Sequence, residues 1–227
     1  MIGPDVVDFS QDFDARIKNA MRFCYFTRAI ELQTKQIGKV EKLLTEVEIL
    51  KNREIDAANE DAANYLLSLE CVAKATLAEL QMYIFLKTDQ MGKAWDSLVD
   101  AQSEAQAAVK AHPKASPMDG VLKRLSLLER AFFPKPMFCS PSFTVRTSKC
   151  SICGEKYGDC GHIKGRPYMG KFCAEIIEKV DKLREVSMVD NPANRHARVI
   201  AYGEGKSKFD VLTLRRIPSD QDLNVQA

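Results

Sequence analysis

The sequence has no long apolar run. Its densest apolar stretch, LQMYIFL at residues 81–87, is far shorter than the roughly 18 residues that a membrane-spanning helix needs. The beginning, MIGPDVVDFSQDFDARIK, is acidic, whereas a secretory signal starts with basic residues and continues with an apolar segment. We therefore expect a protein without a membrane partner that stays in the reducing cytoplasm.

Neither apolar nor charged residues are scarce. With 45% apolar and 28% charged residues, a chain of 227 residues is typical of a globular protein of one large or two modest domains, and two are preferred here. Residues 1–134 contain 17 Lys and Arg against 20 Asp and Glu, whereas residues 135–227 contain 16 against 11. This excess of basic residues allows a polyanionic partner for the second part, although a solvated surface is the favoured explanation.

Turn-forming residues are rare between about Asp12 and Lys110, where the helix formers Ala, Leu, Glu, Lys and Gln predominate. Apolar residues recur there at intervals of three and four, which predicts long amphipathic helices. The predicted helices cover residues 29–55, 61–87, 89–111 and, after the turn-forming HPKASPMDG, 121–133. The stripe of the first helix comprises Phe26, Ile30, Ile37, Val40, Leu44 and Val47.

Four amphipathic helices with short connections predict an antiparallel bundle or a set of helical hairpins. A coiled coil with a second copy is the alternative, because the first stripe is long and regular. Trp95 is expected in the core, and Cys24 and Cys71 are expected to be small buried apolar residues. No catalytic constellation is visible in this part of the chain.

Three prolines in FFPKPMFCSPSF, residues 132–143, mark a boundary. After it, short alternating or β-branched stretches predict strands. These stretches are SFTVRTS, EVSMVD, ARVIAYG and FDVLTLRR. The sequence thus predicts an α+β protein, with a helical domain at 1–134 and a small, metal-stabilised, β-rich domain at 135–227 that ends in a loose polar tail, PSDQDLNVQA.

Cysteine and histidine cluster in KCSICGEKYGDCGH, residues 149–162. Cys150 and Cys153 have the C-x2-C spacing of a metal-binding turn, and Cys160 and His162 follow in a glycine-rich loop. These four donors complete a tetrahedral zinc site. Cys173 is an alternative ligand, in which case Cys160 or His162 leaves the metal. An iron–sulfur cluster is less compatible with the histidine and the compact spacing.

A structural role for the zinc is favoured over a catalytic one. Catalytic zinc keeps an open position for water, whereas thiolate-rich sites with four protein ligands are closed. Glu155, Asp159 and Glu175 are close in sequence to the cysteines, but acidic residues around such a loop are typically surface charges. The metal would supply much of the folding free energy of this short segment.

Downstream, LREVSMVDNPANRHARVIAYG contains a Glu-Val-Ser-hydrophobic-Val strand followed by Pro-Ala-Asn and a second strand. The positions that carry this pattern are Glu185, Val186, Ser187, Val189, Pro192, Ala193, Asn194, Ala197 and Val199. The stretch resembles one near the end of the phage prohead (capsid maturation) protease domain. The preceding residues 150–173 are similar to a cysteine and histidine insert found beside this strand in some phage-related sequences.

This partial resemblance implies a related β-structure over residues 150–203 and a phage-related origin, with virion association as an alternative location. The catalytic histidine and serine of that family come from earlier strands that have no match here, so no catalytic residue is assigned. Ser187 is expected to be a structural strand residue.

The sequence therefore favours a non-enzymatic, zinc-stabilised interaction or assembly protein that binds a protein partner or itself. A prohead-protease-like serine peptidase using His162 and Ser187 is one alternative. Nucleic-acid binding by the basic second part is another, since phosphates attract such side chains. The basic residues concerned are Lys164, Arg166, Lys171, Arg195, Arg198, Arg215 and Arg216.

Overall fold

The computed structural model describes residues 2–204 and 207–218. It has the predicted α+β class, with all helices before Phe133 and all strands after Met137 within that part of the chain. The helices are α1 (Pro4–Met21), α2 (Ile30–Asp56), α3 (Glu60–Lys87), α4 (Met91–Ala111), the short 3-10 helix η1 (Pro113–Ala115) and α5 (Met118–Phe132). The strands are β1 (Phe138–Cys150), β2 (Pro167–Tyr168), β3 (Lys171–Phe172), β4 (Glu175–Val189), β5 (Ala201–Glu204), β6 (Ser207–Asp210) and β7 (Arg216–Ile217).

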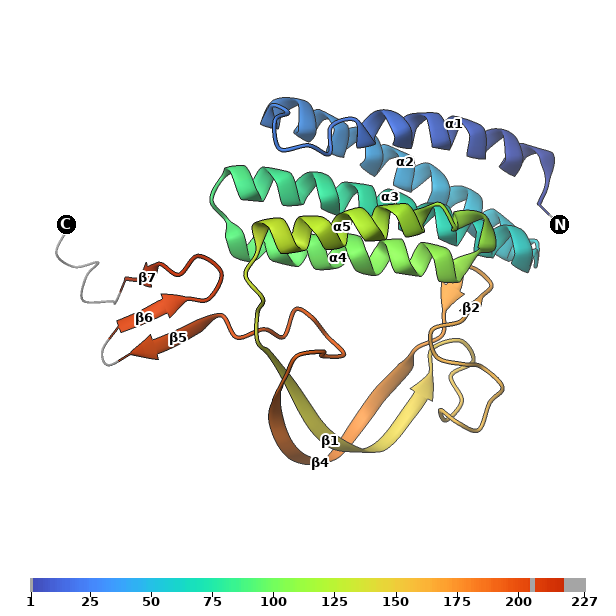
Figure 1. Ribbon diagram of the computed structural model, residues 1–227. Coiled ribbons are helices and arrows are strands. Elements are labelled where there is room, and N and C mark those ends of the chain that lie inside the picture. Colours follow the sequence, from blue (N-terminus) through green and yellow to red (C-terminus); the bar gives the residue numbers. More distant parts are fainter. Residues whose placement is uncertain (1, 205–206, 219–227) are drawn as a thin grey trace, which may run out of the picture.

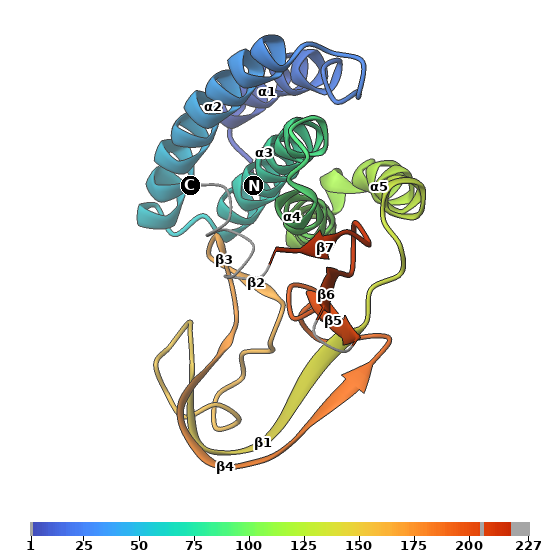
Figure 2. The same cartoon turned by 90° about the vertical axis from the view of Figure 1, so that its left-hand side faces the viewer.

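Helix α3 is the centre of the helical layer, with α2 on one side and α4 on the other (Figure 2). It is rich in Ala and Leu and is buried around most of its circumference, so it contributes to all three apolar clusters of the core. Helices α1 and α2 cover one side of α3, and α5 packs on α4 (Figure 1). A helix that is apolar on all sides needs this position, because only surrounding helices can cover it.

The apolar stripe predicted for α2 is confirmed in part. Val40 and Val47 are buried against α1 and α3, and Leu44 is partly buried there. The extension of the stripe to Phe26 is wrong: α2 begins at Ile30, and the Phe26 side chain is 49% exposed in the preceding loop. The loop leaves the helix direction, so helical spacing no longer decides which side chains face inward.

Polar side chains also occupy the buried face of α2. Gln33 is fully buried, and its amide nitrogen donates hydrogen bonds to the backbone oxygens of Phe23 (2.8 Å) and Tyr25 (3.1 Å). These bonds pair the buried amide group of Gln33 and hold the α1–α2 loop against α2. A stripe read from apolar residues alone misses such a position.

Trp95 lies fully buried in the core, as predicted, and joins the helices to the strands that follow. Its ring contacts Phe133 edge-on at 5.5 Å between centroids and lies 6.1 Å from that of Phe138 at the start of β1. The indole Nε1 donates a hydrogen bond to the backbone oxygen of Arg195. Cys24 and Cys71 are also buried, as expected.

Strands β1 and β4 form one long antiparallel hairpin that arches away from the helices and returns to them (Figures 1 and 2). Its register runs from Phe138 opposite Val189 to Cys150 opposite Glu175, with four irregularities between Ser142 and Ser148. Such irregularities bend and twist a two-stranded ribbon. Among the described residues β1 and β4 form a two-stranded sheet, and much of both of its faces is exposed.

The hairpin is attached to the helices near both ends. At the β4 exit, Arg198 donates to the backbone oxygen of Gly92 (3.3 Å), and in the β5–β7 sheet Arg215 pairs with Asp89. At the other end, the N–H of Gly170 between β2 and β3 donates to Oδ1 of Asn64 on α3 (2.9 Å). Independent folding of residues 1–134 and 135–227 stays a prediction. The predicted tail lies, from residue 219 onward, outside the described part of the chain.

Candidate metal centre

The first half of the site is a tight turn at the end of β1. Cys150 is the last residue of that strand, and the N–H of Gly154 donates to its backbone oxygen (2.9 Å). Gly154 has a φ of +76°, a conformation that costs a residue with a side chain about 1–2 kcal/mol. The turn directs the N–H of Ile152 toward the Cys150 sulfur at 3.4 Å. Spacing and glycine together thus give the turn its shape.

The second half is the loop that carries Cys160 and His162. Two tyrosine hydroxyls hold it from outside: that of Tyr157 accepts the N–H of Lys164 (3.3 Å), and that of Tyr168 accepts the N–H of Ile163 (3.0 Å). The ring of Tyr168 also meets His162 edge-on at 4.7 Å between centroids. The sequence analysis missed both tyrosines, because no spacing rule identifies residues that support a ligand loop.

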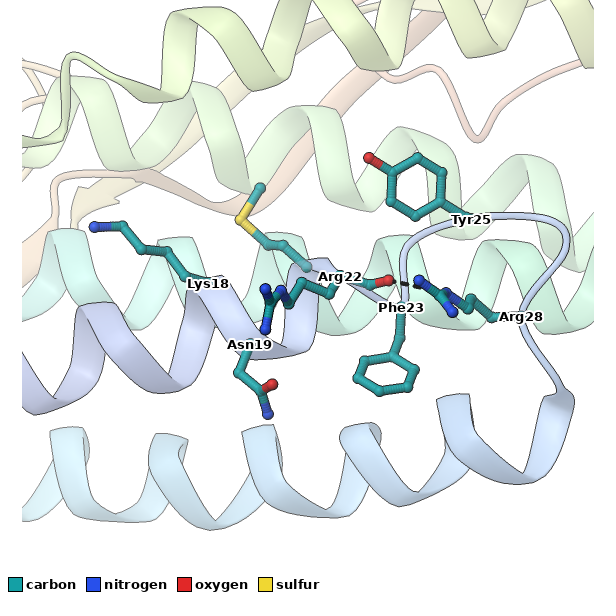
Figure 3. Close-up of a pocket in the computed structure, with 7 residues that line it drawn as sticks. Lys18, Asn19, Arg22, Phe23, Tyr25 and Arg28 are labelled. Atoms are coloured by element: carbon teal, nitrogen blue, oxygen red, sulfur yellow. Dashed lines mark hydrogen bonds between the residues drawn. The ribbon is translucent and has the colours of Figure 1, made fainter.

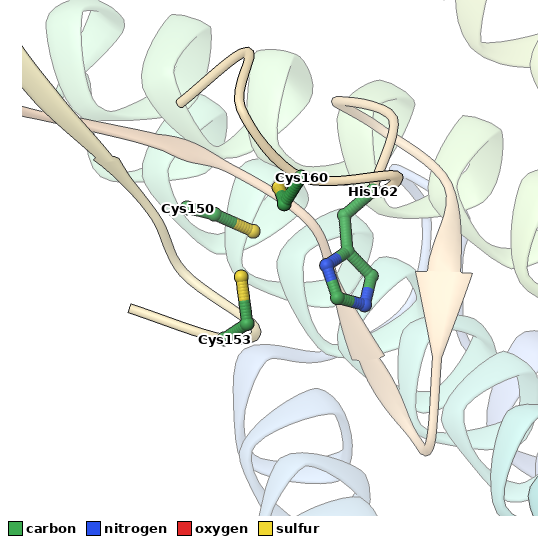
Figure 4. Close-up of side chains that lie close together, drawn as sticks. All are labelled: Cys150, Cys153, Cys160 and His162. Carbon is green, nitrogen blue, oxygen red and sulfur yellow. The ribbon is translucent and has the colours of Figure 1, made fainter. Parts of the chain in front are cut away.

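The four predicted ligands converge on one point. The Sγ atoms of Cys150, Cys153 and Cys160 and a ring nitrogen of His162 all lie within 4.8 Å of one another. Figure 4 shows the three sulfurs facing each other and the imidazole turned toward them. Nδ1 of His162 is buried and has no hydrogen-bond partner. Buried polar atoms are normally paired, so an unpaired nitrogen beside three thiols fits a site built for a metal ion.

Cys173, the alternative ligand, is also at the site. It is 2% exposed, and its Sγ lies 3.7 Å from that of Cys150. A zinc–sulfur bond of about 2.3 Å in tetrahedral geometry separates two ligand sulfurs by about 3.8 Å. The structure therefore brings together five donors, of which a tetrahedral ion takes four, and the choice between Cys173 and one of the other donors stays open.

The thiols of the site differ in acidity. Burial acts to raise the pKa of Cys150, but hydrogen bonds from the N–H groups of Cys153 and Ile152 and from the neighbouring thiols lower it to about 6. Burial, followed by contact with Cys150, raises the pKa of Cys173 above its ordinary value. Cys150 is thus more acidic than Cys173, and a bound metal ion would displace the protons of the thiols that coordinate it.

Two of the nearby carboxylates, Glu155 and Asp159, belong to the surface as the sequence analysis expected, whereas the Glu175 side chain is only 24% exposed. Asp159 lies 3.6 Å from Lys156, and Glu175 lies 3.7 Å from Lys164, in both cases measured between charged atoms. Glu155 is exposed. In the described residues, the group of potential metal donors contains no carboxylate. No general base therefore faces the cluster from these three positions.

The two residues considered for a serine peptidase are not brought together. Ser187 pairs with Ser140 near one end of the hairpin, whereas His162 belongs to the cluster at Cys150, ten residues further along β1. At about 3.3 Å per residue, this separation is roughly 33 Å along the strand. The Ser187 hydroxyl donates instead to Glu185 at 3.1 Å.

Several of the basic residues considered for nucleic-acid binding contact the protein itself. Arg195 bonds to Gln102 and Glu129, and the Arg198 side chain is only 8% exposed. Together with the Arg215–Asp89 pair, these contacts attach the strands to the helices. Arg195 and Arg198 are thus engaged within the protein, whereas Arg215 is 66% exposed in a surface ion pair.

In comparisons with known proteins, no family model, no curated protein and no solved structure matches the chain. Among the described residues, no helix is both long and apolar enough to cross a membrane.

Proposed function

We propose that this protein is a non-enzymatic, zinc-stabilised interaction or assembly protein. In this proposal the metal fixes one end of the β1–β4 hairpin, and the hairpin presents apolar side chains to a protein partner or a second copy. The exposed apolar surface of the hairpin is the observation that carries the proposal.

The chemistry of the donors supports zinc. Thiolates and imidazole are the ligands of structural zinc sites, and the separation of the Cys150 and Cys173 sulfurs suits its tetrahedral geometry. Each of the possible ligand sets supplies four protein donors. A closed set leaves no position at which the ion could activate water, which supports a structural role.

The hairpin exposes more apolar surface than a two-stranded ribbon needs. Leu183, Val186 and Met188 are each 61% exposed, and Val180 is 52% exposed. A two-stranded hairpin has marginal stability by itself, and exposed apolar clusters on proteins mark contact surfaces. The outer edge of β1 is bridged at Phe138 and at Lys149, but the stretch between them could accept a further strand. The resemblance of residues 183–203 to a phage capsid-maturation protein supports an assembly role.

The metal part of the proposal is tested by elemental analysis and zinc K-edge spectroscopy of reduced protein. We expect about one zinc per chain and no oxygen ligand. Four sulfurs would identify the set of Cys150, Cys153, Cys160 and Cys173. Three sulfurs and one nitrogen would show that His162 binds, and an unchanged spectrum in Cys173→Ala would then identify Cys160 as the third thiolate. Absence of zinc, or hydrolytic turnover that follows zinc content, would contradict the proposal.

The interaction part is tested with a photo-crosslinking amino acid at Val186, used in the natural host. The matched control is Leu127 on α5, which is exposed to a similar extent (64%) but lies outside the hairpin. We expect one defined crosslinked protein, which mass spectrometry identifies as a partner or a second copy, from position 186 only. Equal products from both positions, or none from position 186, would contradict an interaction surface on the hairpin.

A further inference from the structure

A second surface, far from the metal centre in sequence, is a basic hollow where α1 ends and the α1–α2 loop begins. Its volume is about 670 Å³. Figure 3 shows the side chains around it, which come from the last turn of α1 and from the loop. They are Lys18, Asn19, Met21, Arg22, Phe23, Tyr25 and Arg28. Three of the seven are cationic and none is acidic.

The positive surface continues along the groove between α1 and α2. Asn19 also lines a second hollow of about 160 Å³, to which α2 contributes Lys39 and Lys42. These two lysines are exposed and are three residues apart on α2, so they share one side of the helix. The two hollows thus form a continuous track with five cationic side chains.

These five cations lack carboxylate partners. In the described part of the chain, Lys18, Arg22, Arg28, Lys39 and Lys42 form no ion pair, although residues 1–134 contain more acidic than basic residues. Other basic residues of the same two helices do form ion pairs: Arg16 with Asp12 and Glu46, and Arg53 with Asp5. The track is therefore a local excess of positive charge in an acidic part of the protein, which attracts an anion.

One cation of the track is already held in place. Nε of Arg28 donates to the backbone oxygen of Arg22 (3.2 Å), and its guanidinium carbon lies 5.7 Å from the centroid of the Phe23 ring. The terminal nitrogens of the guanidinium donate no hydrogen bond to other described residues. A fixed guanidinium with free terminal donors is suited to a phosphate group.

Exposed aromatic rings lie beside the cations. The side chain of Tyr25 is 58% exposed and that of Phe26 is 49% exposed. The Phe26 ring is stacked on Phe132 of α5, with centroids 6.0 Å apart, and follows Tyr25 in the loop. Rings of this kind provide platforms on which unpaired bases stack. A duplex hides its base faces, so the rings favour a single strand over a duplex.

We propose that this track binds single-stranded nucleic acid, with phosphates on the five cations and bases on Tyr25 and Phe26. This site is distinct from the basic residues of the second part of the chain. It makes no use of the metal centre or of the hairpin, so it stands or falls independently of the proposed function.

The test is fluorescence anisotropy of the full-length protein with a short labelled oligothymidylate at several salt concentrations. Five phosphate contacts predict a slope of about −3.5 for the logarithm of the binding constant against that of the salt concentration. Affinity should then fall roughly 100-fold between 50 and 200 mM salt. The double variant Arg22→Gln/Arg28→Gln should reduce the slope to about −2.

Matched variants separate charge, stacking and folding. Lys39→Gln/Lys42→Gln should reduce the slope equally, and among the described residues neither exposed lysine forms an ion pair whose loss could destabilise the protein. The control Lys110→Gln/Lys123→Gln removes the same charge from exposed positions on α4 and α5 and should leave the slope unchanged. Tyr25→Ala should weaken binding roughly tenfold, whereas Tyr25→Phe should retain it.

Three results would overturn the proposal. They are an unchanged slope in both track variants, full affinity in Tyr25→Ala, and binding to anionic lipid vesicles in the absence of binding to the oligonucleotide. The last result would assign the cations to a membrane surface.

Discussion

Gly170 lies where the metal-bearing part of the chain meets the helices, and we expect alanine at this position to weaken that contact. Its φ is +71°, which costs a residue with a side chain about 1–2 kcal/mol. A Cβ atom would also lie 3.2 Å from both Cδ1 of Ile55 and Cγ of Lys51. Both atoms belong to side chains that can shift slightly, so we expect a total loss of about 2 kcal/mol.

Amide hydrogen exchange at residue 170 measures this loss directly, because the N–H donates to Asn64 only while the two parts are in contact. A loss of about 2 kcal/mol accelerates exchange through this opening roughly 30-fold. Zinc affinity should stay within about threefold of wild type, since Gly170 lies outside the set of ligands.

The matched variant is Gly154→Ala in the metal-binding turn. Gly154 has a similar φ of +76°, but a Cβ atom there would meet nothing within 4 Å. We expect it to lower zinc affinity about fivefold to thirtyfold while leaving exchange at residue 170 of the zinc-loaded protein unchanged. If both variants lowered zinc affinity equally, or if exchange were unaffected in Gly170→Ala, the assignment of separate roles would be refuted.

Three further predictions concern stability. Cys150→Ser should abolish the effect of zinc on folding of the strands and preserve the helical circular dichroism signal. Cys139→Ser, outside the cluster, should resemble wild type. Loss of most of the helical signal in Cys150→Ser would contradict two separate folding units. Leu43→Ala, at a buried α2 position, should cost about 2–5 kcal/mol in denaturant unfolding, and Leu32→Ala, at a position 46% exposed, less than about 0.5 kcal/mol. Burial acts to raise the pKa of Glu70, but ion pairs with Lys51 and Lys74 lower this pKa overall. The ionised Glu70 carboxylate therefore stabilises the fold above its unfolded-state pKa, and this contribution is lost as the pH falls through its lower folded-state pKa. The stability difference between wild type and Glu70→Gln, roughly 1–3 kcal/mol at neutral pH, should therefore shrink in acid, and a constant difference would show that the carboxylate is not involved.

Helical spacing predicted most of the bundle, because each helix must bury one apolar side. It identified α2, α3, α4 and α5 to within a few residues at most ends. It did not separate α1 as a helix of its own, since the turn before Ile30 contains no proline or glycine to mark it. Nor did it show that α3 would be buried almost all round, which depends on where its neighbours lie.

The metal centre was the most predictable part of the site. Close spacing in sequence and a required glycine constrain Cys150 and Cys153 locally, so few arrangements of this turn are available. The contacts of Tyr157, Tyr168 and Asn64 could not be predicted, because each depends on a loop conformation or on the approach of another element.

The sequence by itself determined the α+β class, the buried stripes and the residues able to form a metal centre, since each depends on near neighbours along the chain. Only the tertiary structure decided that Cys173 approaches Cys150 and that Ser187 lies far from His162. It alone also gathered Lys18, Arg22, Arg28, Lys39 and Lys42 on one track. These outcomes depend on strand register and helix packing, which bring together residues whose separation along the chain carries no information about their distance in space.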